Sequence, residues 1–303
     1  MAKSYIRFWG VRGSYSAPFK RCLDTGGNTP CVEINVDGHL LICDAGSGII
    51  PLGHQLIADD KNRELLILLT HFHWDHISGL PFFAPAFHPK YNINFFGPGE
   101  SKEIVKKYID DQMKAPYFPV GTEEWVANIS YIDTKKKSIT YGPMEISYYS
   151  AYHPGITYGY KINVKNKCIV YIPDNECLSL DKEIRENSEG FNNEEIDILE
   201  EMNREEYKAE VNTIADADIL IHDAQYTPED YKMKKGWGHS CYTDVINMAI
   251  DAKVKKLFLF SHDPSNDDEM ILKIHEGAKK IIKDRNSSLE CFVSKESLEV
   301  SLD

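Results

Sequence analysis

One short segment constrains this chain more than any other, the run Leu69-Thr70-His71-Phe72-His73-Trp74-Asp75-His76. It places four side chains of metal-ligand type within six positions, directly after the strongest apolar strand pattern, Leu65 to Thr70. Binding residues gather on loops at strand ends, because the scaffold beneath holds them in place. If the loop enters a helix at Ile77, its first two histidines point to one locus, and Asp75 and His76 point to an adjacent one. The pattern therefore predicts a loop that serves two metal ions.

Further candidate ligands come later in the chain, most of them just after β-type runs, as a site assembled from several loops requires. A lone histidine is more often a hydrogen-bonding or exposed group than a ligand, but together these residues reinforce one another. They are His153, Asp174, His222, His239 and His262. His222 ends an apolar run and is interpreted as a packing residue outside the catalytic set.

Short β-type runs recur along the whole chain, and amphipathic helical patterns lie among them. The predicted strands cover Tyr5 to Trp9, Cys31 to Val36, Leu40 to Cys43, Leu65 to Thr70, Ile93 to Phe96, Ile146 to Tyr149, Tyr158 to Val164, Cys168 to Ile172, Ile219 to Ile221 and Leu257 to Phe260. The predicted helices cover Lys102 to Met113, Glu194 to Thr213, Tyr242 to Ala252 and Glu269 to Lys283. Several strands are apolar throughout and must be buried on both faces, which favours two packed sheets with helices outside. The sequence predicts a layered α/β sandwich, built as a single domain over residues 1–303 because no linker divides it.

The charge balance bears on the choice of partner. The 303 residues include 34 lysines and arginines against 47 aspartates and glutamates, a formal net charge of −13. A negative chain repels polyanions at long range, so a long nucleic acid is disfavoured as a partner. Many of the acids lie in a predicted helical insertion around residues 179–211, which is interpreted as a solvated helix or as a lid beside the site.

The seven cysteines are scattered, partly inside apolar runs, and form no CxxC pair. Buried free thiols are typical of a reducing compartment. The chain begins without the apolar stretch of a signal peptide, and no run is long enough for a membrane span. These features predict a cytoplasmic protein.

The histidine-rich run also carries a resemblance to a known family. Residues 71–76 match the HxHxDH signature of the metallo-β-lactamase-fold hydrolases. Further motifs resemble the phosphodiesterase branch of that superfamily, which includes ribonuclease Z and class II-type cyclic-nucleotide phosphodiesterases. They are Phe8-Trp9-Gly10-Val11-Arg12-Gly13-Ser14, Gly26-Gly27-Asn28-Thr29-Pro30-Cys31, Leu41-Ile42-Cys43-Asp44-Ala45-Gly46-Ser47-Gly48, His222-Asp223-Ala224-Gln225, Gly238-His239-Ser240 and Ser261-His262-Asp263-Pro264. The resemblance spans nearly the whole chain and implies a four-layer αββα sandwich.

The resemblance further implies a dinuclear metal site. His71, His73 and His153 would hold one ion, Asp75, His76 and His262 would hold the second, and Asp174 would bridge the two. Imidazole and carboxylate ligands without thiolate suit zinc and tolerate manganese or iron. Two divalent ions with a bridging hydroxide as nucleophile would make the pocket locally positive, which attracts a phosphodiester.

Five more residues are expected at the site. His239 is the predicted proton donor to the leaving group, held by Asp223, where ribonuclease Z carries a glutamate. Asp44 is expected to accept a hydrogen bond from a metal-bound imidazole, with a turn cap as the alternative. Tyr117 and Trp237 are expected to contact the substrate, with core packing and plain exposure as their respective alternatives.

The leading hypothesis is a dinuclear metal-dependent phosphodiesterase that acts on small, cyclic nucleotide-type phosphodiesters. A tRNA 3′-processing endonuclease is the first competing hypothesis, which the HDAQ and GHS motifs favour and the acidic insertion does not. The second is a lactone or thioester hydrolase on the same fold, and the third is a metal-stabilised binding protein. The resemblance to ribonuclease Z also suggests a homodimer.

Overall fold

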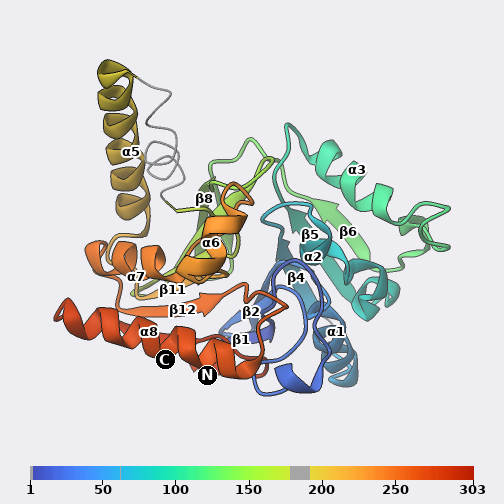
Figure 1. Ribbon diagram of the computed structural model, residues 1–303. Coiled ribbons are helices and arrows are strands. Elements are labelled where there is room, and N and C mark those ends of the chain that lie inside the picture. Colours follow the sequence, from blue (N-terminus) through green and yellow to red (C-terminus); the bar gives the residue numbers. More distant parts are fainter. Residues whose placement is uncertain (1–2, 62, 178–191) are drawn as a thin grey trace.

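Two mixed β-sheets face each other at the centre of the molecule (Figure 1). The computed structural model describes residues 3–61, 63–177 and 192–303. The first sheet has seven strands in the order β14-β1-β2-β3-β4-β5-β6, and the second has seven in the order β13-β12-β11-β10-β9-β8-β7.

Ten of the fourteen described strands and four of the described helices follow predicted runs closely. The first sheet contains β1 (Tyr5–Gly10), β2 (Cys31–Val36), β3 (His39–Cys43), β4 (Arg63–Leu68), β5 (Tyr91–Phe96), β6 (Asn128–Tyr131) and β14 (Glu299–Ser301). The second contains β7 (Ser138–Tyr141), β8 (Met144–Ser150), β9 (Tyr158–Val164), β10 (Lys167–Ile172), β11 (Ile219–Asp223), β12 (Lys256–Phe260) and β13 (Glu290–Val293). The helices are α1 (Ile49–Ala58), α2 (Trp74–Ile77), α3 (Lys102–Gln112), α5 (Asn193–Ile214), α6 (Pro228–Lys234), α7 (Tyr242–Asp251) and α8 (Asp268–Asp284).

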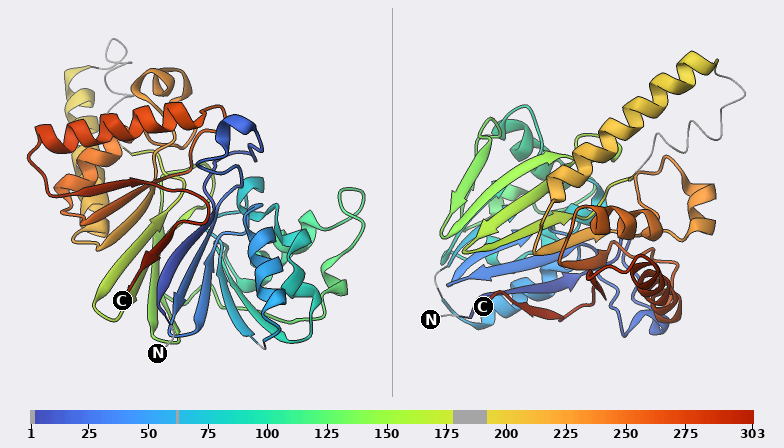
Figure 2. Two further views of the ribbon diagram at one scale, coloured as in Figure 1. Left: turned by 90° about the horizontal axis from the view of Figure 1, so that it is seen from below. Right: turned by 90° about the vertical axis from the view of Figure 1, so that its left-hand side faces the viewer.

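The apolar runs account for the layers. Ile34 and Leu66 of the first sheet share one buried cluster with Ile162 and Phe260 of the second. Helices α1 and α3 cover the outer face of the first sheet, and α7 and α8 cover that of the second (Figure 2). This arrangement confirms the predicted α/β sandwich with four αββα layers.

Helix α5 projects away from the rest of the molecule (Figures 1 and 2). Its C-terminal residue Ile214 is buried, whereas Ile198 and Met202 are 55% and 50% exposed. A capping box between Asn192 and Glu195 starts the helix. The predicted acidic insertion thus contains a helix over its second part, and its first part, up to residue 191, lies outside the described residues.

The strand directions bring the chemically interesting loops to one edge. Strands β3 to β6 run parallel, as do β10 to β13. Loops that follow the carboxyl ends of neighbouring parallel strands meet at the same edge of a sheet. The histidine-rich loop follows β4, Asp174 follows β10, and His262 follows β12.

All seven cysteines are free thiols, and six of them are buried, as the sequence predicts. Among the described helices, none combines the length and apolarity that a bilayer crossing needs.

Candidate active site

The histidine-rich loop closes into one short helical turn. Helix α2 begins at Trp74 rather than at the predicted Ile77. Gly46 lies so close to this turn that a Cβ there would be 2.1 Å from the Asp75 carbonyl oxygen. Only glycine permits such an approach, which explains the glycine in the DAGSG segment after β3.

Ligand-type atoms from several elements converge above the sheet edge. Three groups have atoms that all lie within 4.8 Å of one another: His71, His73 and His153; His71, His76 and Asp174; and His153, Asp174 and His239. We call His71, His73 and His153 the first half of the cluster, and Asp75 with His76 the second half. Oδ2 of Asp174 lies between them, 3.5 Å from Nε2 of His71 and 3.2 Å from Nε2 of His76.

The cluster fits a bound cation. Nε2 of His71 and Nε2 of His76 are buried and have no hydrogen-bond partner. Burial holds the pKa of His71 well below its usual value, so that imidazole is neutral and its lone pair is free for a metal. Burial also lowers the pKa of His76, but Asp174 and Asp75 outweigh it and hold that pKa well above its usual value. The excess of negative charge around His76 favours a cation at this position.

Asp44 lies fully buried beneath the cluster and orients His76. It accepts hydrogen bonds from Nδ1 of His76, from the Tyr171 hydroxyl and from the Thr70 amide, each over 2.8 Å. Because Nδ1 faces this carboxylate, Nε2 of His76 faces the cluster. The structure therefore places Asp44 where the sequence expects a carboxylate behind a ligand imidazole.

His239 and Asp223 form the expected pair. Nδ1 of His239 donates to Oδ2 of Asp223 over 2.7 Å, so the aspartate reaches the imidazole despite its shorter side chain. The amides of Asn175 and Gln225 also donate to Asp223 and hold it in place. Burial lowers the pKa of His239, but Asp223 and Asp174 outweigh burial and raise it to about 9. The imidazole therefore carries a proton at neutral pH.

A tight turn precedes His239 and also touches the first half of the cluster. Glu176 accepts hydrogen bonds from the amides of Gly236 and Gly238, each over 2.8 Å. Nδ1 of His153 donates to the Gly238 carbonyl over 2.7 Å. Gly238 has a φ of +84°, and a Cβ there would lie 2.4 Å from Nδ1 of His153. The turn therefore requires glycine.

The structure does not bring His262 into the cluster. Its Nε2 donates to the Ser294 carbonyl over 3.0 Å, and none of the three ligand groups found among the described residues includes it. Ser261, with a φ of +55°, turns its own hydroxyl to 3.3 Å from Asp174. Burial lowers the pKa of His262 to about 3, which leaves a neutral, packed imidazole.

The two expected substrate contacts are both exposed. Tyr117 is 79% exposed and lines a cavity of about 440 Å³ with Trp74 and Tyr108. Trp237 is 62% exposed and lines neither this cavity nor a neighbouring cavity of about 400 Å³ that contains His71.

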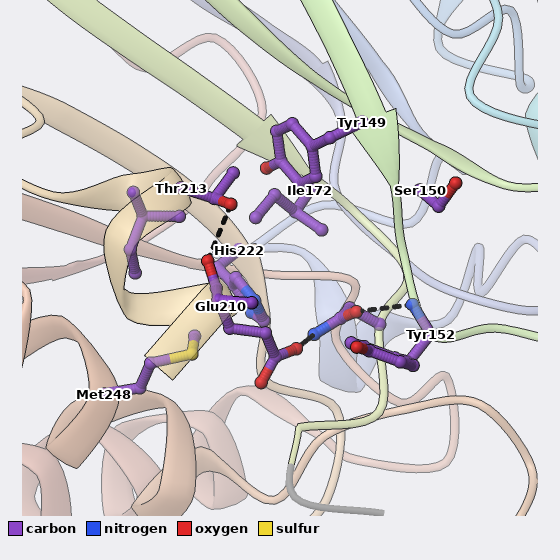
Figure 3. A pocket seen from close by; sticks show the side chains of 11 residues that line it. Tyr149, Ser150, Tyr152, Ile172, Glu210, Thr213, His222 and Met248 are labelled. Atoms are coloured by element: carbon purple, nitrogen blue, oxygen red, sulfur yellow. Dashed lines mark hydrogen bonds between the residues drawn. The ribbon is translucent and has the colours of Figure 1, made fainter. Parts of the chain in front are cut away.

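A smaller cavity of about 90 Å³ lies beneath α5 (Figure 3). Asn175 donates from Nδ2 to Glu210 over 3.0 Å and accepts a hydrogen bond from the Tyr152 amide over 2.8 Å. Asn175 follows Asp174 directly, so its side chain joins α5 to two of the loops that build the cluster. His222 lines this cavity rather than the cluster, and burial lowers its pKa to about 4, in keeping with a packing role.

Sequence reasoning did not single out Asn175, Glu176, Glu210 or Ser261. Ser261 lies in the Ser261-His262-Asp263-Pro264 motif, but the sequence directs attention to its histidine. The other three lie in no motif with a known spacing, and Asn175 pairs with Glu210 and Glu176 with the Gly236 and Gly238 amides, all distant along the chain. The nearest available signal is position, because Asn175 and Glu176 directly follow a candidate ligand at the end of a strand.

Comparison with known proteins gives one family and a consistent set of relatives. Residues 41–262 match the model of the Beta-lactamase superfamily domain. Ribonuclease Z of Sulfurisphaera tokodaii is 27% identical over 92% of this chain and 93% of its own length. Ribonuclease Z of Picrophilus torridus is 25% identical over 100% of this chain and 97% of its own length.

Solved structures show the same fold. The metallo-beta-lactamase fold protein YhfI from Bacillus subtilis has a TM-score of 0.67 at 15% identity, covering 98% of this chain and 99% of its own. Human tRNase Z, short form, has a TM-score of 0.60 at 16% identity, covering 99% of both chains.

The relatives overturn one expectation. The prediction that a long nucleic acid is disfavoured as a partner is wrong, because eight relatives are named Ribonuclease Z. The net charge of a whole chain is a long-range average, and salt screens it beyond about 8–10 Å. It therefore does not decide what binds at the cluster, where bound metal ions would set the local charge.

Proposed function

This chain belongs to the beta-lactamase superfamily and is a metal-dependent hydrolase, and from that premise we propose that it cleaves phosphodiesters in RNA, at the 3′ end of tRNA precursors. The observation that carries the proposal is the near full-length similarity to two proteins named Ribonuclease Z. The pairing of His239 with Asp223 supports it, since it supplies a proton donor of the kind a departing alkoxide requires. This proposal ranks the tRNA alternative above the small cyclic phosphodiesters.

The residues of the cluster would hold two divalent ions, for which we propose zinc. The ligands would be the two halves of the cluster and Asp174. When bound, such ions supply Lewis-acid activation of the phosphodiester. His239 keeps Nδ1 on Asp223, so its Nε2 is the atom from which a proton passes to the leaving oxygen.

A small phosphodiester is the second candidate substrate. The cavity of about 400 Å³ that contains His71 and His73 has a volume typical of small-ligand sites and would accept a mononucleotide. A cyclic nucleotide therefore belongs in the same test as tRNA.

The test is a substrate panel offered to enzyme loaded separately with zinc and with manganese. The panel contains a precursor tRNA with a 3′ trailer, 2′,3′- and 3′,5′-cyclic AMP, and bis(p-nitrophenyl) phosphate. Cleavage of the precursor at the end of the acceptor stem is the expected result. Turnover of the cyclic nucleotides without tRNA cleavage would favour the second candidate, and silence on the whole panel would direct attention to lactones and thioesters.

We also propose that the chain acts as a single-domain homodimer in the cytoplasm. Size-exclusion chromatography with light scattering measures the oligomeric state directly, and a monomeric mass would contradict the dimer.

A further inference from the structure

Next to the cluster, we propose an aromatic shelf that stacks unpaired nucleobases of the substrate strand. The shelf consists of Phe72, Trp74, Tyr108 and Tyr117. The inference rests on the proposed function as a phosphodiester hydrolase, and it adds the part of the substrate that the chain recognises.

The shelf lies along two adjoining cavities. The cavity of about 400 Å³ contains His71 and His73 and is also lined by Phe72 and Tyr108. The cavity of about 440 Å³ is lined by the same Phe72 and Tyr108. Because the two cavities share these walls, a strand whose phosphate lies at the cluster can continue along both of them.

Three of the four shelf side chains are unusually exposed for aromatic residues, and Phe72 is partly buried beside them. Trp74 is 77% exposed, Tyr117 is 79% exposed and Tyr108 is 43% exposed. Ile156, on the wall of the first cavity, is 63% exposed as well. Contiguous exposed apolar groups at one place usually mark a binding surface.

The backbone holds the shelf residues in place. Trp74 begins α2 directly between two candidate ligands, and Tyr108 lies on α3. The Phe72 ring packs edge-on against Tyr108 with ring centroids 4.9 Å apart. Tyr117 lies between two prolines, at positions 116 and 119, which restrict the backbone on both sides. The packed rings of Phe72 and Tyr108 would lose little entropy when a planar ligand stacks on them.

The chemistry of the lining favours bases over phosphates. Neither cavity has a lysine or arginine among its lining residues, which instead include Glu100 and Asp111. Lys107 lies 5.7 Å from the Tyr108 ring centroid, but its ammonium pairs with Asp111 over 2.6 Å. Affinity along the shelf must therefore come from π-faces, and a base exposes its faces only when it is unpaired and unstacked.

Fluorescence anisotropy on the metal-loaded enzyme tests the shelf. The probes are a labelled phosphorothioate tetranucleotide, which resists cleavage, and an abasic tetranucleotide with the same backbone charge. We expect the wild type to bind the tetranucleotide at least about tenfold more tightly than the abasic probe. Trp74→Ala and Tyr117→Ala should each reduce this preference about five- to tenfold, whereas Trp74→Phe and Tyr117→Phe should retain most of it. The preference should persist when the salt concentration is raised, because phosphate contacts do not create it.

Phe19→Ala is the matched control, since Phe19 is an aromatic residue with 41% exposure that does not line either cavity. Equal binding of the two probes by the wild type overturns the proposal, as does absence of binding. An equal loss of affinity for both probes in the alanine variants also overturns it, and so does a change of oligomeric state in those variants, which would make the surface a subunit contact.

Turnover of bis(p-nitrophenyl) phosphate by the same wild-type preparation separates the two hypotheses. If the wild type turns this substrate over but shows no preference for bases, the shelf is wrong and the hydrolase proposal stands. If bases are preferred but neither this substrate nor the precursor tRNA is cleaved, the proposed function is wrong.

Discussion

The two halves of the cluster contain different types of ligand side chain. The first half contributes three imidazoles from two loops, with Nε2 of His153 only 3.0 Å from Nδ1 of His73. The second half contributes one imidazole and one carboxylate, with Nε2 of His76 3.4 Å from Oδ2 of Asp75. Near the second half, the hydroxyl of Ser261 faces Asp174 at the place where the sequence predicts an imidazole.

This difference teaches that two ion positions in one pocket need not be equivalent. Imidazole nitrogen is a better ligand for zinc than a serine hydroxyl, so the first half should bind an ion more tightly. The second half depends more on the carboxylates around it, namely Asp75, Asp174 and the buried Asp44. We therefore expect two separate affinities, with the second half filling at higher metal concentration.

The largest expected effect comes from the carboxylate that both halves share. Asp174→Ala should lose both ions and lower phosphodiester turnover by at least about 10³-fold, because the metal supplies most of the activation. Elemental analysis for metal per chain and the rate with bis(p-nitrophenyl) phosphate measure the two losses. Asp284→Ala, on the exposed end of α8, is the control. Retention of both ions would show that Asp174 is not shared.

The next largest effect is expected from a substitution of His239, which should lower the turnover rate while both halves keep their metal ions. His239→Ala should keep its metal content but lower turnover about 100-fold, because the leaving oxygen loses its proton donor. His54→Ala, an exposed histidine on α1, controls for the loss of an imidazole as such. Normal turnover in metal-bound His239→Ala would end the assignment as proton donor, whereas loss of an ion would place His239 among the ligands.

A substitution of Asp44 should have a smaller effect and should distinguish the metal affinities of the two halves. Asp44→Asn should weaken the second ion about 10- to 100-fold and the first much less, because His76 bonds this carboxylate directly whereas His71 reaches it only through the Thr70 hydroxyl. Calorimetric titration of the metal-free protein with zinc resolves the two binding steps. Tyr171→Phe removes one hydrogen bond to Asp44 and should give a weaker effect of the same kind. Equal weakening of both steps would contradict the separation of the halves.

The sequence predicts most of the fold, because the apolar runs of the buried strands repeat from end to end. It misses α1, where Pro51 and Gly53 lower the helix propensity and packing against the first sheet overrides it. It also misses helix α6 and four short strands, β6, β7, β13 and β14. A segment of three or four residues carries too little periodicity to be recognised alone.

The cluster is predictable as far as its motif extends. The loop at residues 71–76 can be recognised because four ligand-type side chains lie within six positions. Asp174 can be recognised as an acidic residue at the end of a strand. Asn175 and Glu176 give no such signal, because they act through Glu210 and through the amides of Gly236 and Gly238, which only the fold brings near. Which of two consecutive residues faces a site depends on one backbone dihedral angle, and the letters of a sequence do not show it.

A substitution of His262 tests which of the consecutive residues 261 and 262 faces the cluster. It should have the smallest effect on metal content and turnover. In the structure its imidazole packs against the Ser294 carbonyl, so His262→Ala should keep both ions and the turnover of the wild type. Loss of the buried imidazole and of its hydrogen bond should instead cost roughly 2–4 kcal/mol in the free energy of unfolding, measured with urea. If His262→Ala loses the weaker ion, the imidazole turns into the second half when metal binds, and the two halves are more alike than the structure indicates. If it loses neither, the second half holds its ion without an imidazole from this strand end, and the unequal affinities of the two halves stand.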